Sequence, residues 1–321
     1  MLAMSDLALV LVLALTLEVV LGDPVTRWHP VAVFGAFINR LMAFAPAEGP
    51  VRQLAFGAAV VALGVGLVAA GSATALQWIT GSSGIAAMIL GGVLLKVSLS
   101  YRQLEREAVE VADLIETARL TEARLALQAL VARETGGLAA SLAASAAVES
   151  VAENLSDSFV APLFYFVLLG VPGALAYRAV NTLDAMIGYH GRFEYLGRVA
   201  AKMDDVANFI PARLTAGLIV LAAALAGSDA RGAAAVALQD HRRTASPNAG
   251  WPMAAMAGAV QARIEKVGHY RLGAADGDCT PLTIRDAVRV ARRGAVLAAA
   301  FAIAAALGAS GSGSLWSGLL L

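Results

Sequence analysis

Long apolar segments are the feature that most constrains this chain. Residues 54–79 form an almost uninterrupted apolar run, and shorter runs cover 7–21, 85–99 and 295–307. A membrane-spanning helix needs about 20 consecutive apolar residues, and a helix pairs its own backbone groups, as lipid requires. Hydrophobic residues make up 59% of the sequence, and the mean hydropathy is +0.70. We therefore predict an all-α, polytopic integral membrane protein with spans near these four segments.

Two further apolar segments, 159–176 and 214–226, are ambiguous. Pro162, Gly170 and Pro172 interrupt the first, and the second is short. Lys and Arg are absent from 80–84 but frequent in the other loops, and cytoplasmic loops are typically rich in these residues. If all of those loops are cytoplasmic, the two segments are re-entrant or packed inside the protein; otherwise they cross as a pair. We predict four to six membrane helices in the inner cell membrane, with the active site facing the cytoplasm.

The segment 101–135 has a different pattern. Leu104, Val111, Leu114 and Leu127 recur at helical spacing among Glu and Arg residues. This pattern predicts two amphipathic cytoplasmic helices joined near residue 120, with Thr121 capping the second. Because no low-complexity linker interrupts the chain, we interpret residues 1–321 as one membrane-embedded domain.

Charge and cysteine content exclude several classes of protein. Charged residues are only 15% of the chain and the formal net charge is zero, which argues against a nucleic-acid partner. Cys279 is the single cysteine, so neither an intramolecular disulfide framework nor a cysteine-rich zinc site is expected. The sequence also has no Walker A loop and no dinucleotide-binding fingerprint.

Three acidic residues stand out in the apolar surroundings of 149–157. Glu149, Glu153 and Asp157 are spaced by four residues, so on a helix they share one face. Like charges on one face repel each other unless a cation lies between them. Polar clusters near lipid are functional-site hypotheses, and we interpret this one as a metal or substrate site; the alternative is a solvated helix face.

Two further clusters repeat this pattern. Asn181 and Asp184 form one, and Asp204, Asp205 and Asn208 form the other. Hard oxygen ligands suit magnesium, which usually keeps waters and bridges to phosphate. Basic side chains that can neutralise phosphate oxygens lie near them in sequence, namely Arg178, Lys202 and Arg213. Carboxylates, magnesium and cationic side chains together favour phosphoryl chemistry.

Two polar loops complete the set. Asp23 and His29 follow the first apolar run, and His29 is interpreted as a base, a phosphate contact or a helix cap. The stretch 246–250 reads Ser-Pro-Asn-Ala-Gly and precedes a small-residue helix. A loop that opens a helix can present free backbone N–H groups to an anion, so we expect substrate binding there.

These motifs, in this order, carry a resemblance. Gly22-Asp23-Pro24, Glu149-Ser150, Glu153-Asn154, Asn181-Thr182-Leu183-Asp184, Gly188-Tyr189, Asp204-Asp205, Pro211-Ala212-Arg213 and the 246–250 stretch occur between about residues 16 and 273. Jointly, the set resembles the integral-membrane adenosylcobinamide-phosphate synthases of cobalamin biosynthesis.

The resemblance implies an ATP- and magnesium-dependent carbon–nitrogen ligase. It would join the free propionate of adenosylcobyric acid, a corrinoid, to aminopropanol or aminopropanol phosphate. The partners expected are these substrates and the lipid bilayer, together with a second copy of the chain or other enzymes of the cobalamin pathway. The resemblance does not decide between the two amino alcohols.

The resemblance also assigns candidate roles. The catalytic candidates are Glu149, Glu153, Asp157, Asp184 and Asp205. The metal candidates are Glu153, Asp157, Asp184 and Asp204. The candidates for binding substrate or phosphate are Asp23, His29, Arg133, Asn154, Asn181, Lys202, Asn208, Arg213, Ser246 and Asn248.

Two other functions fit part of this pattern. A magnesium-dependent membrane prenyltransferase also uses acidic clusters, but it would have repeated Asp-rich motifs, whereas the clusters here differ from one another. A non-catalytic membrane sensor of related fold is the other alternative.

Overall fold

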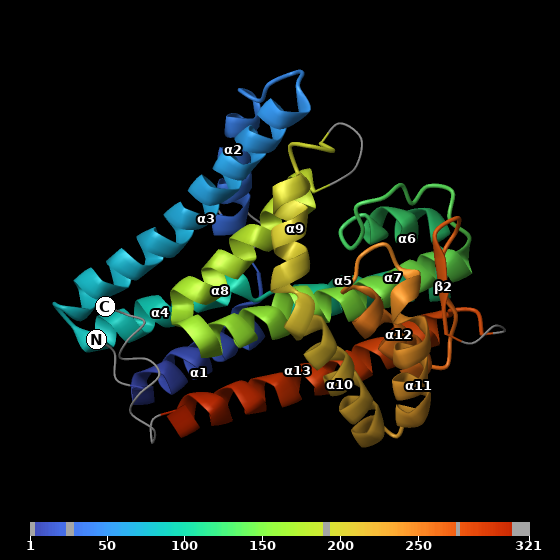
Figure 1. Ribbon diagram of the computed structural model, residues 1–321. Coiled ribbons are helices and arrows are strands. Elements are labelled where there is room, and N and C mark those ends of the chain that lie inside the picture. The colour runs from blue at the N-terminus through green and yellow to red at the C-terminus, as the bar shows by residue number, and fades with distance from the viewer. Residues whose placement is uncertain (1–3, 24–28, 189–192, 274–276, 310–321) are drawn as a thin grey trace. The chain divides into compact units, whose positions relative to one another are not determined.

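The computed structural model describes residues 4–23, 29–188, 193–273 and 277–309. Helices dominate the described residues, and a single short hairpin adds the only strands among them (Figure 1). Contacts divide the chain into two compact units, which are described separately. Pro24 and Tyr189, which belong to the motifs above, lie outside the described residues.

The first unit contains residues 1–100, 161–207 and 299–321. Its helices are α1 (Met4–Leu21), α2 (Pro30–Met42), α3 (Pro50–Thr80), α4 (Gly84–Ser98), α8 (Ala161–Ile187) and α9 (Arg198–Ala207). Pro30 begins α2, where its missing N–H costs nothing, and the His29 ring accepts a hydrogen bond from the Val31 N–H over 3.3 Å. Ser83 caps α4 in the same way.

A compact apolar core joins α2, α3, α8 and α9 in this unit. It contains Ile38, Val60, Leu183 and Ile187, all buried. Glycine allows close approach here: a Cβ atom on Gly57 would overlap the Leu196 carbonyl oxygen. This packing fixes the position of α9 against the end of α8.

The second unit contains residues 101–160 and 208–298. Its elements are α5 (Tyr101–Glu116), α6 (Leu120–Leu127), α7 (Ala140–Leu155), the π-helical turn η1 (Ser156–Val160), α10 (Phe209–Ala226), α11 (Ala230–Asp240), the 3-10 turn η2 (His241–Arg243), α12 (Gly250–Ala259), β1 (Ile264–Lys266), β2 (Tyr270–Leu272) and most of α13 (Pro281–Ala309).

Small residues form the core of the second unit. Nine of the ten residues of α12 are buried, the exception being Trp251. Helix α12 packs closely on α11, because Gly258 lies against the backbone of Gly232. Side chains with little volume let helix backbones approach each other. Asp229 caps α11 by accepting a hydrogen bond from the Gly232 N–H over 2.7 Å.

The prediction of a polytopic all-α membrane protein is confirmed. Within the described residues, five helical segments are long and apolar enough to cross a membrane. They are Pro50–Thr80, Gly84–Glu116, Ala140–Ile187, Phe209–Ala226 and Pro281–Gly308. The first predicted span lies in α1, a shorter apolar helix. Re-entrancy, orientation and the single-domain assignment stay predictions.

The two ambiguous segments are both helical. Residues 214–226 lie in α10, and 159–176 covers the end of η1 and the start of α8. The expected interruption is present, because Gly170 has φ +67° and ψ −163° inside α8 and is followed by Pro172. Proline in a helix removes a hydrogen bond and produces a kink.

The amphipathic pattern of 101–135 corresponds to α5 and α6. Leu104 and Val111 are buried, as the pattern predicts. The predicted cap is wrong, since α6 begins at Leu120 after Arg119 and Thr121 lies inside the helix. Ala118, with φ +57°, reverses the chain between the two helices and moves the boundary by one residue.

The hairpin was not predicted. β1 and β2 pair antiparallel, with Glu265 opposite Arg271 and Lys266 opposite Tyr270. Gly268 adopts φ +77° in the connecting turn, a conformation that favours glycine. Three-residue strands lack the long alternating pattern by which a strand is normally recognised.

Candidate functional site

An ion pair between Arg133 and Glu149 lies at the centre of the polar residues of the second unit. Arg133 Nη2 is 3.1 Å from Glu149 Oε2, and the Glu149 side chain is only 9% exposed. The Nε and Nη1 atoms of Arg133 are buried and have no hydrogen-bond partner among the described residues. A guanidinium carries five N–H donors in a planar fork, so these two atoms can bind an anion.

Tyr270, on β2, is the third member of this cluster. Its side chain hydrogen-bonds Glu149, and the charges of Glu149 and Glu153 act on it. Burial first, and then the nearby Glu149 carboxylate, raise the pKa of Tyr270 far above its usual value. The phenol therefore stays protonated and donates its hydrogen bond to Glu149, which Arg133 contacts as well.

Helix α7 presents Glu153 and Asn154 one turn beyond Glu149. The Asn154 side-chain NH₂ donates to the Ser150 carbonyl and to the Ser150 hydroxyl, each over 3.0 Å. The Ser150 hydroxyl in turn donates to the Leu130 carbonyl over 2.7 Å. Asn154 is therefore held firmly in one orientation, and Glu153 is more exposed than Glu149.

Asp157 does not continue the α-helical register of the two glutamates. It lies in the π-helical turn η1, which follows α7 directly. A π-turn has more residues per turn than an α-helix, and such turns often occur at functional sites. The prediction that the three acids share a regular helical face is wrong in this respect, although each lies along the same continuous helix.

A second polar cluster of this unit surrounds Arg213 on α10. Its guanidinium lies 3.7 Å from the centre of the Phe209 ring and 5.2 Å from that of Trp251. Arg213 Nη1 donates to Asn248 Oδ1 over 3.2 Å. The Trp251 ring stacks on His241 with 3.9 Å between centres. Cations are attracted to aromatic faces, so these rings and Asn248 fix the position of Arg213.

The loop before α12 differs from expectation in one respect. Ser246 Oγ accepts hydrogen bonds from the N–H groups of Asn248 and Ala249, over 3.2 and 3.3 Å. These two N–H groups are therefore not free for an anion, because the loop is capped by its own serine. Asn248 is buried, and Asn208, the residue before α10, is buried as well.

In the first unit, α8 and α9 bring the remaining acids together. Asn181 Nδ2 donates to Asp204 Oδ1 over 3.5 Å, and the charges of Asp204 and Asp205 act on Asp184. Lys202 Nζ lies 3.1 Å from Asp205 Oδ2. Residues that are about 20 positions apart in sequence, which the sequence analysis treated as two clusters, therefore lie in one acidic cluster.

Gly188, directly after α8, supports this acidic cluster. Its N–H donates to the Asp184 carbonyl over 2.7 Å. A Cβ atom at this position would overlap the Asp184 carboxylate. Glycine is therefore required for the Asp184 side chain to keep its position beside α9.

Asp23 belongs to a buried network of the same unit. Lys96 of α4 contacts the Asp23 carboxylate and lies 2.8 Å from Glu18 Oε2, and Ser100 donates to Asp23 as well. His29 Nε2 is 3.7 Å from Asp23 Oδ1. Burial opposes ionisation, but the hydrogen bonds from His29, Lys96 and Ser100 outweigh it and hold the pKa of Asp23 well below its usual range.

The described residues fit magnesium in a limited way. They contain no group of three or more His, Cys, Asp or Glu side chains that could hold a metal ion by themselves. Magnesium is usually bound by one or two carboxylates together with water and substrate phosphate. One or two of the Asp184, Asp204 and Asp205 carboxylates fit that donor set, because they are hard oxygen ligands and the charges of Asp204 and Asp205 act on Asp184.

Most of the predicted site residues thus fall into four described clusters; of the others, Asp157 lies in η1, Asn208 precedes α10 and Ser246 shares a loop with Asn248. In the second unit, one cluster contains Arg133, Glu149, Glu153 and Asn154, and another contains Arg213 and Asn248. In the first unit, one cluster contains Asn181, Asp184, Asp204, Asp205 and Lys202, and the other contains Asp23 and His29. The sequence interpretation missed Tyr270, Lys96 and Trp251. Lys96 could have been found from the sequence, because a lysine inside an apolar run is a functional-site hypothesis. Nothing in the sequence links Tyr270 to Glu149.

Comparison with known proteins gives a consistent result. The CobD/Cbib protein family model matches residues 11–292. The cobalamin biosynthesis protein CobD of Dehalococcoides mccartyi (strain CBDB1) is 42% identical over 268 residues, which cover 84% of this chain and 87% of the relative. The protein of the same name from Geobacter metallireducens is 40% identical over 265 residues, covering 80% and 81%.

An archaeal relative agrees with these matches. The probable cobalamin biosynthesis protein CobD of Methanothermobacter thermautotrophicus is 39% identical over 274 residues, covering 84% of this chain and 88% of the relative. No solved structure matches. A family model that covers most of the chain, and relatives at this identity, establish that the chain belongs to the CobD/Cbib protein family.

Proposed function

We propose that this protein is an enzyme of cobalamin biosynthesis that forms an amide bond at the expense of ATP. It joins the free propionate of adenosylcobyric acid to aminopropanol or aminopropanol phosphate. Membership of the CobD/Cbib family supports the pathway. The single structural observation that carries the chemistry is Arg133, which is fixed by Glu149 while two of its buried N–H groups find no acceptor in the part of the protein that the structure describes.

The reaction has two steps in this proposal. A propionate oxygen attacks the terminal phosphorus of ATP, the bond from that phosphorus to the bridging oxygen breaks, and ADP leaves. The amine nitrogen then attacks the acyl carbon of the mixed anhydride, inorganic phosphate leaves, and the nitrogen gives up a proton. Both steps move negative charge onto phosphate oxygens, so fixed cationic donors accelerate them.

Arg133 supplies such donors. Its free Nε and Nη1 groups bind phosphoryl oxygens, and its bond to Glu149 fixes the plane of the guanidinium. Lys202 and Arg213 are the other cations proposed to bind phosphate. Arg213 is held between Phe209 and Trp251, so little side-chain entropy is lost when it binds.

Glu149 and Glu153 have different roles. Glu149 is nearly fully buried between a cation and a phenol, so it orients Arg133. Glu153 lies one turn further along α7 and is more exposed. We assign Glu153 as the general base that accepts the proton of the amine, and Asn154 as a substrate contact.

The acidic cluster of α8 and α9 is the proposed magnesium site. Asp184, Asp204 and Asp205 would provide carboxylate ligands, with Asn181 beside them. When bound, magnesium neutralises phosphate charge and so favours phosphoryl transfer. Glu153 and Asp157 stay candidates for further metal ligands. We place the protein in the inner cell membrane, with these polar clusters on the cytoplasmic side.

A reconstituted assay tests this function. Purified protein in detergent is incubated with adenosylcobyric acid, ATP, magnesium and either amine, and the amide is detected by mass spectrometry. We expect product from wild type, and none from Glu153→Gln or Asp184→Asn. The matched control is Glu134→Gln, because Glu134 is exposed beside Arg133. Folded wild-type protein that yields no amide with either amine would overturn the proposal and favour a non-catalytic sensor.

A further inference from the structure

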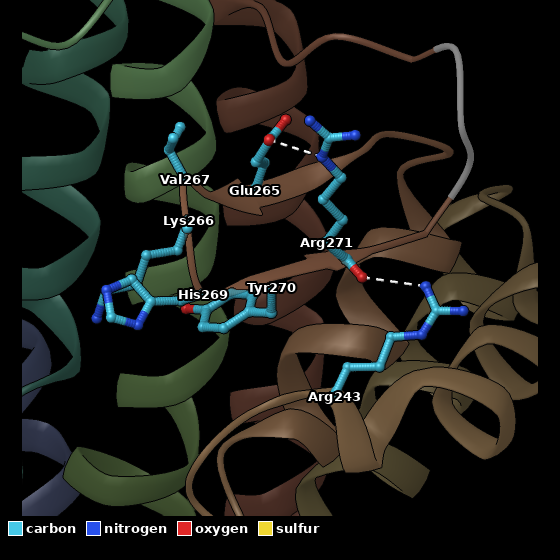
Figure 2. A pocket seen from close by; sticks show the side chains of 8 residues that line it. Arg243, Glu265, Lys266, Val267, His269, Tyr270 and Arg271 are labelled. Atoms are coloured by element: carbon cyan, nitrogen blue, oxygen red, sulfur yellow. Dashed lines mark hydrogen bonds and ion pairs between the residues drawn. The ribbon is translucent and has the colours of Figure 1, made fainter.

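A groove lies along the β1–β2 hairpin of the second unit. It has a volume of about 580 Å³ and is lined by Arg243, Glu265, Lys266, His269, Tyr270 and Arg271 (Figure 2). Small-molecule sites typically have volumes of about 300–1,000 Å³. The groove is therefore large enough for a ligand of that size, although none of the motifs in the sequence pointed to it.

The lining is dominated by positive charge. Three permanent cations, Arg243, Lys266 and Arg271, face a single lining carboxylate. That carboxylate, Glu265, is already paired, since it lies 2.7 Å from Arg271 Nε and 3.4 Å from Arg263 Nε. A concave surface with an excess of one charge attracts ligands of the opposite sign.

The two arginines are held in place by their contacts. Arg243 Nη1 donates to the Arg271 carbonyl over 3.2 Å, and Arg243 Nε lies 3.1 Å from Asp240 Oδ1. Figure 2 shows the contact between Arg243 and Arg271 together with the pairing of Arg271 with Glu265. These contacts fix the shape of the groove before a ligand enters, which lowers the entropy cost of binding.

Lys266 differs from these arginines in its ion pairing. The described residues provide no ion-pair partner for its ammonium group, and none for His269. Lys266 extends from β1 opposite Tyr270. An ammonium group that faces a cationic groove without a carboxylate is available to an anionic ligand.

Tyr270 belongs to both the groove and the Arg133 cluster. Its side chain lines the groove, and it hydrogen-bonds Glu149, which Arg133 contacts over 3.1 Å. Two residues, Tyr270 and Glu149, thus connect a ligand in the groove to the proposed phosphoryl-binding Arg133. This connection distinguishes the groove from an isolated basic surface patch.

From this arrangement we propose that the hairpin groove binds the phosphate group of a substrate, with Lys266 and His269 as its direct contacts. The inference rests on the proposed function and assigns a binding site to it. The shared chemistry is a phosphate group, whether it belongs to a nucleoside triphosphate or to a phosphorylated amino alcohol. An amino alcohol without a phosphate is an ammonium cation at neutral pH, and the excess of positive charge in the groove opposes its binding.

Equilibrium dialysis with the full-length protein in detergent tests this site. The probes are ATP, aminopropanol phosphate, inorganic phosphate and unphosphorylated aminopropanol. Lys266→Ala removes an unpaired cation, so the hairpin keeps its ion pairs; we expect about tenfold weaker binding of one phosphate-bearing probe. Lys266→Glu should weaken binding further, and higher salt should weaken wild-type binding.

Arg242→Ala is the matched control. Arg242 is exposed on the same short turn as Arg243 but does not line the groove. An effect on ATP alone identifies the nucleotide as the ligand, and an effect on aminopropanol phosphate alone identifies the amino alcohol. If Lys266→Glu binds every probe as tightly as Arg242→Ala does, or if wild type binds no phosphate-bearing probe, the proposal is overturned.

This binding assay needs no turnover, so its outcome is separate from that of the amide-forming reaction. In an active protein, Lys266→Ala should raise the KM for the affected substrate and leave kcat within about twofold of the wild-type value. The reason is that Lys266 contacts the substrate away from the reacting atoms. If folded wild-type protein forms no amide while the Lys266 variants bind a phosphate-bearing probe more weakly than Arg242→Ala does, the proposed function is overturned and the groove assignment stands on its own measurement.

Discussion

Arg133 Nη2 lies 3.1 Å from Glu149 Oε2, while the Nε and Nη1 atoms of the same guanidinium are buried with no acceptor among the residues that the structure describes. A buried donor without a partner is costly. A bound anion that accepts hydrogen bonds from these two groups would remove that cost. The pair therefore serves to position the remaining N–H groups of Arg133.

Replacing Arg133 tests that role. In Arg133→Lys the positive charge beside Glu149 is kept, but the planar fork and its two free donors are lost. We expect kcat/KM for amide formation to fall by about a hundredfold or more, the size expected for losing a fixed donor in the transition state. The control is Arg119→Lys, which alters an exposed ion pair with Glu122, and its kcat/KM should equal that of wild type. Wild-type kinetics in Arg133→Lys would contradict the assignment.

Tyr270 gives a prediction about pH. Burial and Glu149 raise its pKa in the folded state above the ordinary value of 10.0. The folded protein thus holds this proton more tightly than the unfolded chain does, so the contribution to stability is complete below pH of about 10 and is lost as pH rises beyond it. Thermal unfolding of wild type and Tyr270→Phe from pH 7 to 11 measures this contribution.

We expect wild type to exceed Tyr270→Phe by about 1–3 kcal/mol near neutral pH, with the difference shrinking above pH 10. Tyr195→Phe, at a more exposed tyrosine, is the control and should show a smaller difference at neutral pH. A difference between wild type and Tyr270→Phe that grows with rising pH would show that the phenol does not donate to Glu149.

The Lys96 network predicts a large effect on stability. Lys96 is buried and neutralises both Glu18 and Asp23. Lys96→Met leaves two buried carboxylates without their cation, and breaking a buried pair costs about 3–5 kcal/mol. Lys202→Met removes an exposed lysine from a pair with Asp205 and should cost less than about 1 kcal/mol. Thermal unfolding in detergent compares the two, and equal melting temperatures would refute the structural role of Lys96.

Gly188 predicts a loss of activity that does not depend on charge. In Gly188→Ala the new methyl group would overlap the Asp184 carboxylate, which must then move away from Asp204 and Asp205. We expect kcat/KM to fall more than about tenfold, since small displacements of a positioned group are costly. Gly217→Ala is the matched control because nothing lies within 4 Å of its added Cβ. Full activity in Gly188→Ala would exclude a role for Asp184.

Much of this fold could be predicted from the sequence because its apolar segments are long. The helices α3, α4 and α13 follow from apolar runs, and the kink at Gly170 follows from neighbouring Pro172. Boundaries were less predictable: Thr121 has the residue type of a cap, yet α6 starts at Leu120 because Ala118 reverses the chain before it. The π-turn at Asp157 has no signature in residue type.

For the candidate sites, residue types were predictable and partners were not. Asp184 and Asp204 stood out in sequence as members of two separate polar clusters, and only the structure brings them into one. Tyr270 is far from Glu149 in sequence, so only the hairpin brings it there. Ser246 suggested an anion-binding loop, but its hydroxyl occupies the backbone N–H groups that an anion would need.

The hairpin Ile264–Leu272 has a consequence for how the ligand preference of this protein can change. Four of the six polar lining residues named for the groove lie within six consecutive positions, 265–270, and Arg271 follows directly. Substitutions or length changes within this one short segment can alter ligand preference while the sequence of every helix stays the same. Selection can therefore act on ligand choice separately from the requirements of membrane insertion.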